Sequence, residues 1–113
     1  MEDNTLRRAM LFDFYGDLLT DKQREYYDLH YNEDLSLGEI AEQSGISRQG
    51  VWDIIRRADR ILTETEEKTG LVERFRQLRQ QVDEIQQLVV RARAENSQEL
   101  LDDVLRRLEA LKH

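Results

Sequence analysis

The chain of 113 residues contains no cysteine, no proline and only five glycines. Without cysteine it can form neither a disulfide framework nor a thiolate metal site, which fits a reducing compartment. Without proline, long helices can continue unbroken, because proline interrupts helices more strongly than any other residue. No apolar run approaches the roughly 20 residues that a membrane-spanning helix needs, so we expect no membrane partner.

The sequence also lacks signatures of catalysis. Its two histidines, His30 and His113, lie far apart, and it has no HExxH zinc motif, no P-loop and no glycine-rich dinucleotide fingerprint. Asp102 and Asp103 lie in the predicted first turn of a helix, where carboxylates interact favourably with the helix dipole. We therefore expect no enzymatic activity and no cofactor.

The composition indicates an all-α protein. Charged residues make up 36% of the chain and hydrophobic residues 39%, and the glycines fall between segments of helical periodicity. The chain opens with Glu2, Asp3 and Asn4 rather than with a basic signal peptide, so we expect a cytoplasmic protein. The length predicts one compact domain or one domain plus an extension, and we place a domain at residues 1–69 and an extension at residues 70–113.

The segment from Ser36 to Ile55 has the pattern of a helix-turn-helix. Ser36 and Glu39 predict a capping box, Gly45 supplies a left-handed turn, and Ser47 predicts the cap of the second helix. Helices are therefore expected at 37–43 and 48–68. Their predicted inward faces consist of small and aliphatic residues at helical spacing: Leu37, Ile40, Ala41, Val51, Ile54, Ile55 and Ala58.

Charge is distributed unevenly along the chain, whose net charge is −7. Residues 1–34 carry four basic and nine acidic side chains, residues 35–60 carry four of each, and residues 61–113 carry nine and eleven. The arginines of the second motif helix form either a cationic patch for nucleic acid or a salt-bridged solvent face in which Asp53 pairs with Arg57. These arginines are Arg48, Arg56, Arg57 and Arg60.

Outward side chains near the start of the second helix of such a motif face base edges in the major groove of DNA. There Arg48 could pair with guanine and Gln49 with adenine. Gly50 weakens the helix by about 1 kcal/mol relative to alanine, and Asp53 would repel phosphate. Trp52 either stacks on a partner or, as we favour, packs beneath the C-terminal helices, because tryptophan is mostly buried. The candidate DNA-binding residues are Ser47, Arg48, Gln49, Trp52, Arg56, Arg57 and Arg60.

Two further helices are predicted before the motif. The first covers about 5–15 and the second about 21–31. The second begins with a predicted capping box of Thr20 and Gln23. The first helix has an apolar stripe that we expect to face the core, with Leu11 beside it: Leu6, Met10, Phe14 and Leu18. After the motif, the acidic run 64–67 is expected to be solvated, and the polar segment 63–69 to fray or bend before a C-cap at Gly70.

The C-terminal part has a heptad pattern of apolar residues. Steps of four and three connect Leu71, Phe75, Leu78, Val82, Ile85, Val89 and Ala92. A second amphipathic helix follows, predicted to be capped by Asn96 with Glu99. The two helices could fold back as an antiparallel hairpin or pair between subunits. Because a single hairpin leaves apolar surface to cover, we expect packing on the N-terminal helices or, as our preferred hypothesis, a homodimer.

The segment from Leu19 to Tyr31 resembles the helix that precedes the helix-turn-helix in region 4 of bacterial sigma factors. In that helix an Arg-Glu pair is followed by alternating apolar positions and a closing aromatic residue, here Arg24, Glu25, Tyr26, Tyr27, Leu29 and Tyr31. With the opening segment from Leu6 to Gly16, about the first 70 residues resemble the YlxM-like family of small bacterial proteins. The genes of that family typically lie beside those of the signal recognition particle.

This resemblance implies a sigma-region-4-like bundle followed by a helical extension, and a regulatory role connected with the signal recognition particle pathway. Two functions are compatible with it. The protein is either a DNA-binding regulator or an adaptor that contacts protein or RNA of the particle without binding DNA. The acidic balance favours the adaptor, and the arginines of the motif favour the regulator.

Overall fold

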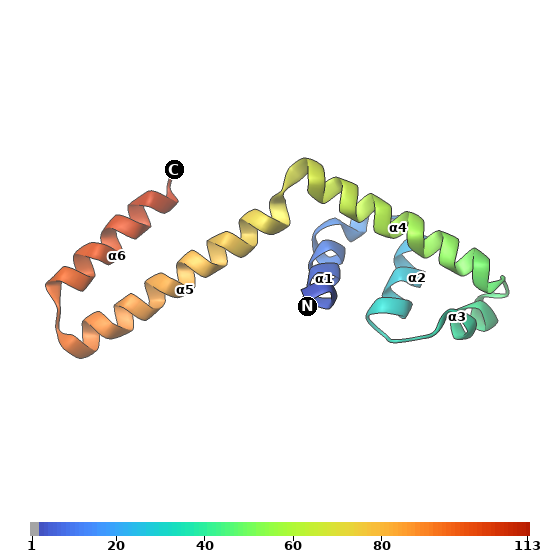
Figure 1. The fold of residues 1–113 in the computed structure, drawn as a ribbon, viewed down its shortest axis with the longest axis horizontal. Coiled ribbons are helices and arrows are strands. Elements are labelled where there is room, and N and C mark those ends of the chain that lie inside the picture. The colour runs from blue at the N-terminus through green and yellow to red at the C-terminus, as the bar shows by residue number, and fades with distance from the viewer. Residues whose placement is uncertain (1–2) are drawn as a thin grey trace. The chain divides into compact units, whose positions relative to one another are not determined.

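The computed structural model describes residues 3–113, with side chains from Asn4 onward, and every regular element in that range is helical (Figure 1). The all-α prediction is therefore confirmed. The elements are α1 (Asp3–Tyr15), the 3-10 turn η1 (Gly16–Leu18), α2 (Asp21–Tyr31), α3 (Leu37–Ser44), α4 (Arg48–Thr69), α5 (Leu71–Glu95) and α6 (Gln98–Leu111).

The chain forms two compact units, which we call the N-terminal unit (Met1–Val72) and the C-terminal unit (Glu73–His113). The N-terminal unit holds α1 to α4 and the first residues of α5. The C-terminal unit holds the rest of α5 and α6. A left-handed Gly70, with φ of 63°, ends α4, and its N–H donates to the Glu66 carbonyl at 2.8 Å. The predicted C-cap glycine is thus confirmed.

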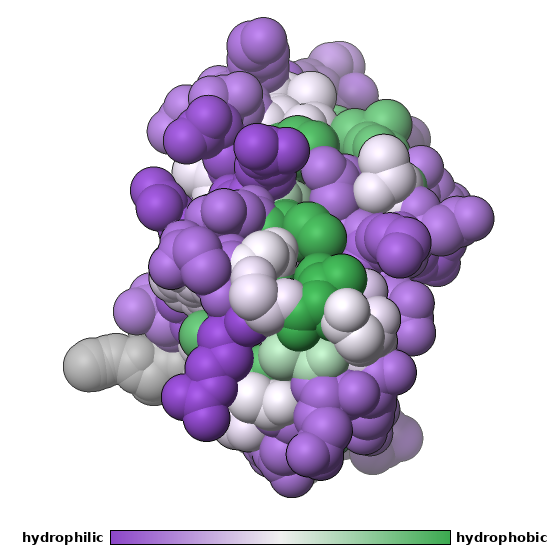
Figure 2. Space-filling view, turned by 90° about the vertical axis from the view of Figure 1, so that its right-hand side faces the viewer, coloured by the Kyte–Doolittle hydropathy of each residue, from purple (hydrophilic) through white to green (hydrophobic). Residues whose placement is uncertain are grey.

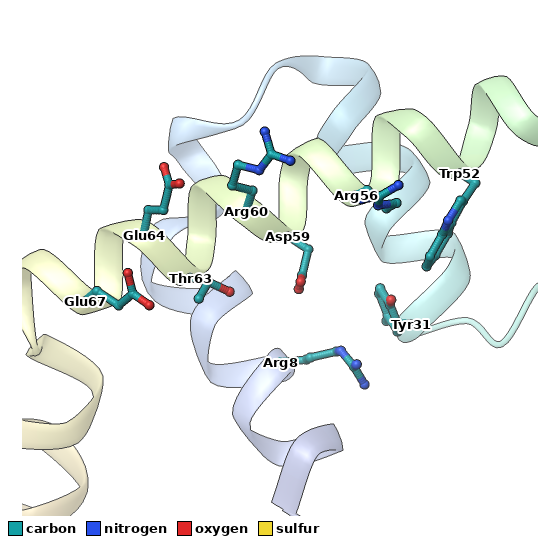
Figure 3. Close-up of a pocket in the computed structure, with 9 residues that line it drawn as sticks. All are labelled: Arg8, Tyr31, Trp52, Arg56, Asp59, Arg60, Thr63, Glu64 and Glu67. Atoms are coloured by element: carbon teal, nitrogen blue, oxygen red, sulfur yellow. The ribbon is translucent and has the colours of Figure 1, made fainter.

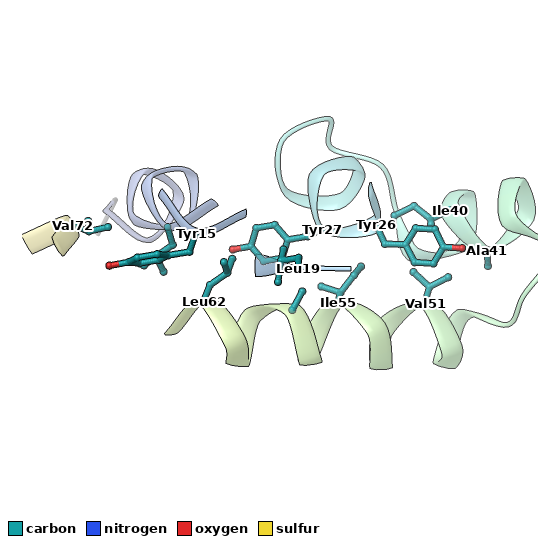
Figure 4. Packing of buried hydrophobic residues seen from close by; sticks show 12 residues of the cluster. Tyr15, Leu19, Tyr26, Tyr27, Ile40, Ala41, Val51, Ile55, Leu62 and Val72 are labelled. Carbon is teal, nitrogen blue, oxygen red and sulfur yellow. The ribbon is translucent and has the colours of Figure 1, made fainter. Parts of the chain in front are cut away.

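The core of the N-terminal unit forms where α4 crosses the other three helices (Figure 4). Side chains from α2 and α3 converge on one face of α4, so that Tyr26, Tyr27 and Ile40 lie against it. The predicted inward face of the helix-turn-helix is confirmed, with two members partly buried (Leu37 and Ile54) and the others buried: Ile40, Ala41, Val51, Ile55 and Ala58.

The prediction for the inward stripe of α1 is wrong at three of its four positions. Leu6, Phe14 and Leu18 are exposed and Met10 is partly buried against the core, whereas Leu11 and Tyr15 are buried. Aromatic contacts explain this orientation in part, because Phe12 stacks on Tyr27 with ring centroids 5.5 Å apart. Spacing along one helix finds an apolar stripe, but a helix with apolar residues on two sides has two such stripes, and packing selects between them.

The end of α4 is also more ordered than its polar sequence predicts. The helix continues to Thr69 without interruption, and Glu66 is only 7% exposed. Its carboxylate accepts the Tyr15 hydroxyl at 2.6 Å and the Val72 backbone N–H at 3.0 Å. One acidic residue of the run expected to be solvated therefore links α1, α4 and the start of α5, as buried polar groups require partners.

The C-terminal unit is a helical hairpin. α6 turns back along the second half of α5, where Arg107 pairs with Glu84 at 3.1 Å. The turn differs from the prediction: Asn96 adopts a left-handed φ of 52°, and Ser97 instead caps α6 by accepting the Leu100 N–H at 3.2 Å. Asparagine tolerates the left-handed region better than most residues, so it takes the turn position and leaves the cap to serine.

Candidate nucleic-acid interface

The helix-turn-helix geometry is set by two caps and a glycine. Ser36 accepts the Glu39 N–H at 3.1 Å while the Glu39 carboxylate accepts the Ser36 N–H at 2.8 Å, so the predicted capping box is confirmed. The Ser36 backbone N–H, followed by the Ser36 hydroxyl, lowers the pKa of the Glu39 carboxyl. Gly45 then ends α3 with φ of 74°, a conformation in which most other residues are strained.

The start of α4 explains why a glycine is tolerated inside the motif. Ser47 caps the helix by accepting the Gly50 N–H at 3.0 Å. A Cβ atom at Gly50 would lie 3.2 Å from the Ser47 hydroxyl, which is closer than ordinary van der Waals contact. The glycine therefore lowers the helix propensity but leaves room for the cap.

The structure places six of the predicted contact residues at the exposed surface of α4 and of the turn before it: Ser47, Arg48, Gln49, Arg56, Arg57 and Arg60. The seventh, Trp52, is half-buried. Its ring lies against α2, 6.4 Å from the His30 ring in an edge-to-face arrangement, which accounts for part of its burial. Figure 2 views the end of the molecule that carries α3, where a mostly hydrophilic surface surrounds a small hydrophobic area.

The arginines of α4 have no ion-pair partners in the part of the chain that the structure describes. Within residues 3–113, none of the ion pairs involves Arg48, Arg56, Arg57 or Arg60. The Asp53–Arg57 pair of the salt-bridged alternative is absent from the described residues, where Asp53 instead accepts the Gln49 side-chain amide at 2.9 Å.

Arg48 lies close to the first turn of α3. A Cβ atom built on Gly38 would be 3.0 Å from the Arg48 guanidinium. Gly38 thus leaves the space that the Arg48 side chain occupies, and the first arginine of α4 rests on the neighbouring helix rather than extending freely into solvent.

Two hollows flank Arg56 and Arg60. The larger, an open groove of about 490 Å³, runs between α1, α2 and α4 (Figure 3). We call it the aromatic groove, and its lining residues are Arg8, Tyr31, Trp52, Arg56, Asp59, Arg60, Thr63, Glu64 and Glu67. The smaller hollow, of about 310 Å³, lies on the other side and is lined by Asp53, Arg56, Arg57 and Arg60.

The aromatic groove contains residues that sequence reasoning did not select as functional. Arg8 comes from α1 and Tyr31 from the end of α2, and the Arg8 guanidinium carbon lies 4.5 Å from the centre of the Tyr31 ring. This is a cation–π contact. No local motif joins positions 8, 31 and 59, because only the packing of three helices brings them together.

A row of five aromatic rings leads from this groove into the core. Trp52, His30, Tyr31, Tyr27 and Phe12 follow one another with neighbouring ring centroids 4.8 to 6.4 Å apart. The Tyr27 hydroxyl is buried and has no hydrogen-bond partner among the described residues. Burial, followed by the nearby Asp59 carboxylate, raises the pKa of Tyr27, so its hydroxyl stays neutral.

Other kinds of site find no support in the described residues. No group of three or more histidine, aspartate or glutamate side chains in that part of the chain is arranged to hold a metal ion. None of the helices described between residues 3 and 113 combines the length and apolar character needed to cross a membrane.

Comparison with known sequences identifies a family and individual proteins that are similar to this chain. Residues 2–104 match the UPF0122 family, described as "Putative helix-turn-helix protein, YlxM / p13 like", a description that names no enzymatic activity. A UPF0122 protein of Thermoanaerobacter sp. (strain X514) is 42% identical over 115 residues, which cover 98% of each chain. A UPF0122 protein of Bacillus cereus (strain AH187) is 43% identical over 111 residues, covering 98% of this chain and 99% of its own.

Proposed function

Because the chain belongs to the UPF0122 family of YlxM/p13-like helix-turn-helix proteins, we propose that it is a regulatory protein that binds double-stranded DNA. The N-terminal part of α4 enters the major groove, as in other helix-turn-helix proteins. The observation that carries this proposal is the set of exposed arginines on α4 without carboxylate partners in residues 3–113. A DNA-binding role also implies a cytoplasmic location.

The candidate residues divide by position along α4. Ser47, Arg48 and Gln49 lie at its start, where side chains reach base edges. Before it contacts a base, Arg48 must leave its position beside Gly38, and Gln49 must share its amide with Asp53. Further along α4, three arginines are placed for phosphate contacts, and Trp52 borders them: Arg56, Arg57 and Arg60.

The charge of the protein limits the affinity. The N-terminal unit carries nine basic and sixteen acidic side chains, so phosphates are attracted only locally, near α4. With about four phosphate contacts per chain, counterion release predicts a slope of roughly −3 to −4 for log K against log salt. One chain alone should bind weakly, and two chains together more strongly.

We therefore also propose that the protein acts as a homodimer joined through its C-terminal unit. Within residues 73–113, only Ile85, Ala92 and Val104 are buried, whereas most of the heptad positions are exposed, including Leu78 at 45%. The C-terminal unit has eight basic and eight acidic residues, so two copies do not repel each other through net charge. A second copy would cover an apolar face that water otherwise contacts.

The dimer can be tested by light scattering at tens of micromolar. We expect twice the chain mass of 13.5 kDa, and a Leu78→Glu variant should return the mass of one chain. The control is Leu105→Glu, since Leu105 is 64% exposed and lies outside the heptad seam of α5. A monomeric mass for the unaltered protein would remove the dimer from the proposal.

A second function rests on the net charge of −7. DNA-binding proteins are rarely acidic, because the phosphates of DNA repel negative charge. The resemblance to YlxM-like proteins connects the chain with the signal recognition particle. In this alternative the helix-turn-helix is an adaptor surface that contacts protein or RNA of that particle and does not bind DNA.

Mobility-shift assays across a salt series distinguish the two functions. Duplex DNA containing the promoter that neighbours the gene is compared with the protein and the RNA of the particle, in the presence of competitor DNA. A double variant Arg48→Ala, Arg56→Ala should abolish most duplex binding. The matched control, Arg93→Ala with Arg106→Ala, removes two exposed arginines of the C-terminal unit and should bind nearly as well as the unaltered protein.

Each outcome selects between the functions. A sequence-specific shift that disappears in the α4 variant supports the regulator. Unchanged duplex binding by that variant contradicts the proposal that α4 contacts the DNA. Binding to the protein or the RNA of the particle, without binding to DNA, supports the adaptor.

A further inference from the structure

The aromatic groove has a stacking surface. Tyr31 and Trp52 line it and remain half-buried, and both belong to the row of rings that continues into the core. Rings held by several neighbours lose little conformational freedom on binding. Nucleic-acid bases stack on such rings regardless of sequence, because every base has a π face.

Charged groups of both signs border these rings (Figure 3). Asp59 extends from α4 toward α1, and Arg8 extends from α1 into the same space. Arg56 and Arg60 lie on the α4 side of the groove. Asp59 takes part in no ion pair among the described residues, so its carboxylate has acceptor capacity for a ligand.

The combination fits a nucleotide better than it fits other ligands. The volume of about 490 Å³ falls within the roughly 300–1,000 Å³ of small-molecule sites. An inorganic anion would make no use of the rings, and an apolar ligand would leave the charged groups without partners. A carboxylate beside the rings would repel phosphate but can accept an N–H from a base edge, as aspartate does with the cytosine amine.

Duplex recognition alone leaves part of this groove unexplained. A helix-turn-helix reads the duplex through its second helix, which gives no role to Arg8 of α1 or to Asp59 below the exposed face of α4. In a duplex each base is stacked on both sides and its pairing edge is occupied, so its face becomes available to protein rings only when it is unpaired.

We propose that the aromatic groove binds one unpaired nucleotide of a nucleic-acid strand. The base stacks on Trp52 and Tyr31, Asp59 accepts an exocyclic amine of the base, and Arg56 with Arg60 holds the adjoining phosphate. The Arg8 guanidinium, which lies 4.5 Å from the centre of the Tyr31 ring in the same groove, borders the base. This inference rests on the nucleic-acid role proposed above and adds a second contact surface, which shares Arg56 and Arg60 with the surface proposed for the duplex.

Trp52 makes this proposal testable, because it is the only tryptophan of the chain. Its fluorescence is measured while the full-length protein is titrated with short single strands, each made once as DNA and once as RNA. One strand contains adenine and cytosine, which carry exocyclic amines, and the other contains only thymine or uracil, which do not. We expect the amine-bearing strand to quench Trp52 and to bind about tenfold more tightly than its partner, through stacking and the Asp59 contact.

The decisive variant is Asp59→Asn. Removing an acidic charge strengthens a purely electrostatic attraction to phosphate, whereas the proposed contact predicts several-fold weaker binding of the amine-bearing strand. The matched control is Asp53→Asn on the same helix, since Asp53 lies in the smaller hollow and not in the aromatic groove. Its binding should stay equal or become slightly tighter.

Two further variants, measured by anisotropy of a labelled strand, separate stacking from loss of folding. Trp52→Phe keeps a ring and should retain most of the binding, whereas Trp52→Leu should lose about tenfold, with both proteins checked by thermal unfolding. Tighter binding of the amine-bearing strand by Asp59→Asn overturns the groove proposal. So does the absence of Trp52 quenching by both the DNA and the RNA strands. The duplex assays above are unaffected by that outcome, and the DNA and RNA arms identify which strand supplies the nucleotide.

Discussion

The two compact units solve the problem of burying apolar residues in different ways. In the N-terminal unit, four helices enclose a continuous cluster of buried side chains that includes Tyr27, Ile40, Ile55 and Leu62, each without measurable exposure. In the C-terminal unit, two helices bury three apolar residues and leave eight large ones exposed. The N-terminal unit is also strongly acidic, while the C-terminal unit has no net charge.

This difference shows that the number of helices, rather than the strength of the apolar pattern, decides whether a unit can bury its apolar residues without a partner. The heptad pattern of α5 runs without interruption from Leu71 to Ala92, yet most of its residues stay exposed, because one neighbouring helix can cover only one side and α6 is shorter than α5. α4 also has apolar residues at helical spacing, but it contacts α1, α2 and α3. An apolar stripe therefore becomes a core where several helices enclose it and stays exposed where only one helix covers it.

The largest expected effect compares one leucine from each unit. Leu62→Ala should lower the free energy of unfolding by about 2–5 kcal/mol, because it leaves a cavity in a closely packed core. Leu105→Ala should change it by no more than about 0.5 kcal/mol, since that side chain is mostly exposed. Urea unfolding followed by circular dichroism measures both, and equal losses would show that the two units are equally well packed.

The next effect concerns the buried carboxylate that only the N-terminal unit contains. Tyr15→Phe removes the hydroxyl that Glu66 accepts at 2.6 Å and should cost about 1.5–3 kcal/mol, as for other hydrogen bonds to charged groups. Tyr26→Phe is the control, because the change is chemically identical and Tyr26 lies in the same cluster. If the two variants lose the same stability, the link between α1 and α4 has no special energetic role.

The same tyrosine gives this unit an alkaline limit. Burial, then the hydrogen bond to Glu66, raises the pKa of Tyr15, so the folded state disfavours its ionised form. Its contribution to stability is fully present below the unfolded pKa of about 10 and is lost as the pH rises from there through the raised folded pKa. The C-terminal unit contains no tyrosine. Tyrosinate absorbance should therefore rise together with loss of the N-terminal unit, and Tyr15→Phe should weaken that dependence.

A smaller effect contrasts the left-handed residues of the two units. Gly45→Ala, at φ of 74°, should cost about 1–2 kcal/mol. Asn96→Gly, at φ of 52° in the hairpin turn, should instead stabilise slightly, since glycine adopts this conformation without a Cβ penalty. Thermal unfolding of both variants measures whether each substitution raises or lowers the stability. Destabilisation by Asn96→Gly would mean that the asparagine side chain stabilises the turn by more than its left-handed backbone costs.

The smallest effect concerns acid sensitivity at helix starts. The pKa of Glu39 is lowered by its hydrogen bonds to Ser36, so its capping contribution is present above the unfolded pKa of about 4.3 and is lost as the pH falls through the lower folded pKa. The cap of α6 has Leu100 at the corresponding position and lacks a titrating partner. Hydrogen exchange should therefore show fraying of α3 before that of α6 as the pH falls, and simultaneous fraying would contradict this.

Several local features follow directly from the sequence. Serine and threonine three residues before glutamate or glutamine predict the caps of α2 and α3, and Gly45 and Gly70 predict the ends of α3 and α4, because these hydrogen bonds and dihedral preferences involve only neighbouring residues. The same locality explains the failure at Asn96. Asn96 and Ser97 are both good capping residues, and only the shape of the hairpin decides between them.

The amino-acid sequence by itself determined most of the helix boundaries of this protein, and which face of the helix-turn-helix is apolar, because caps and the 3.6-residue period act within a few turns. Only the tertiary structure decided which stripe of α1 is buried, that Glu66 lies inside, and that Arg8, Tyr31 and Asp59 share one groove with Trp52. Those outcomes depend on helices far apart in the sequence meeting in space, and no periodicity within one helix contains that information.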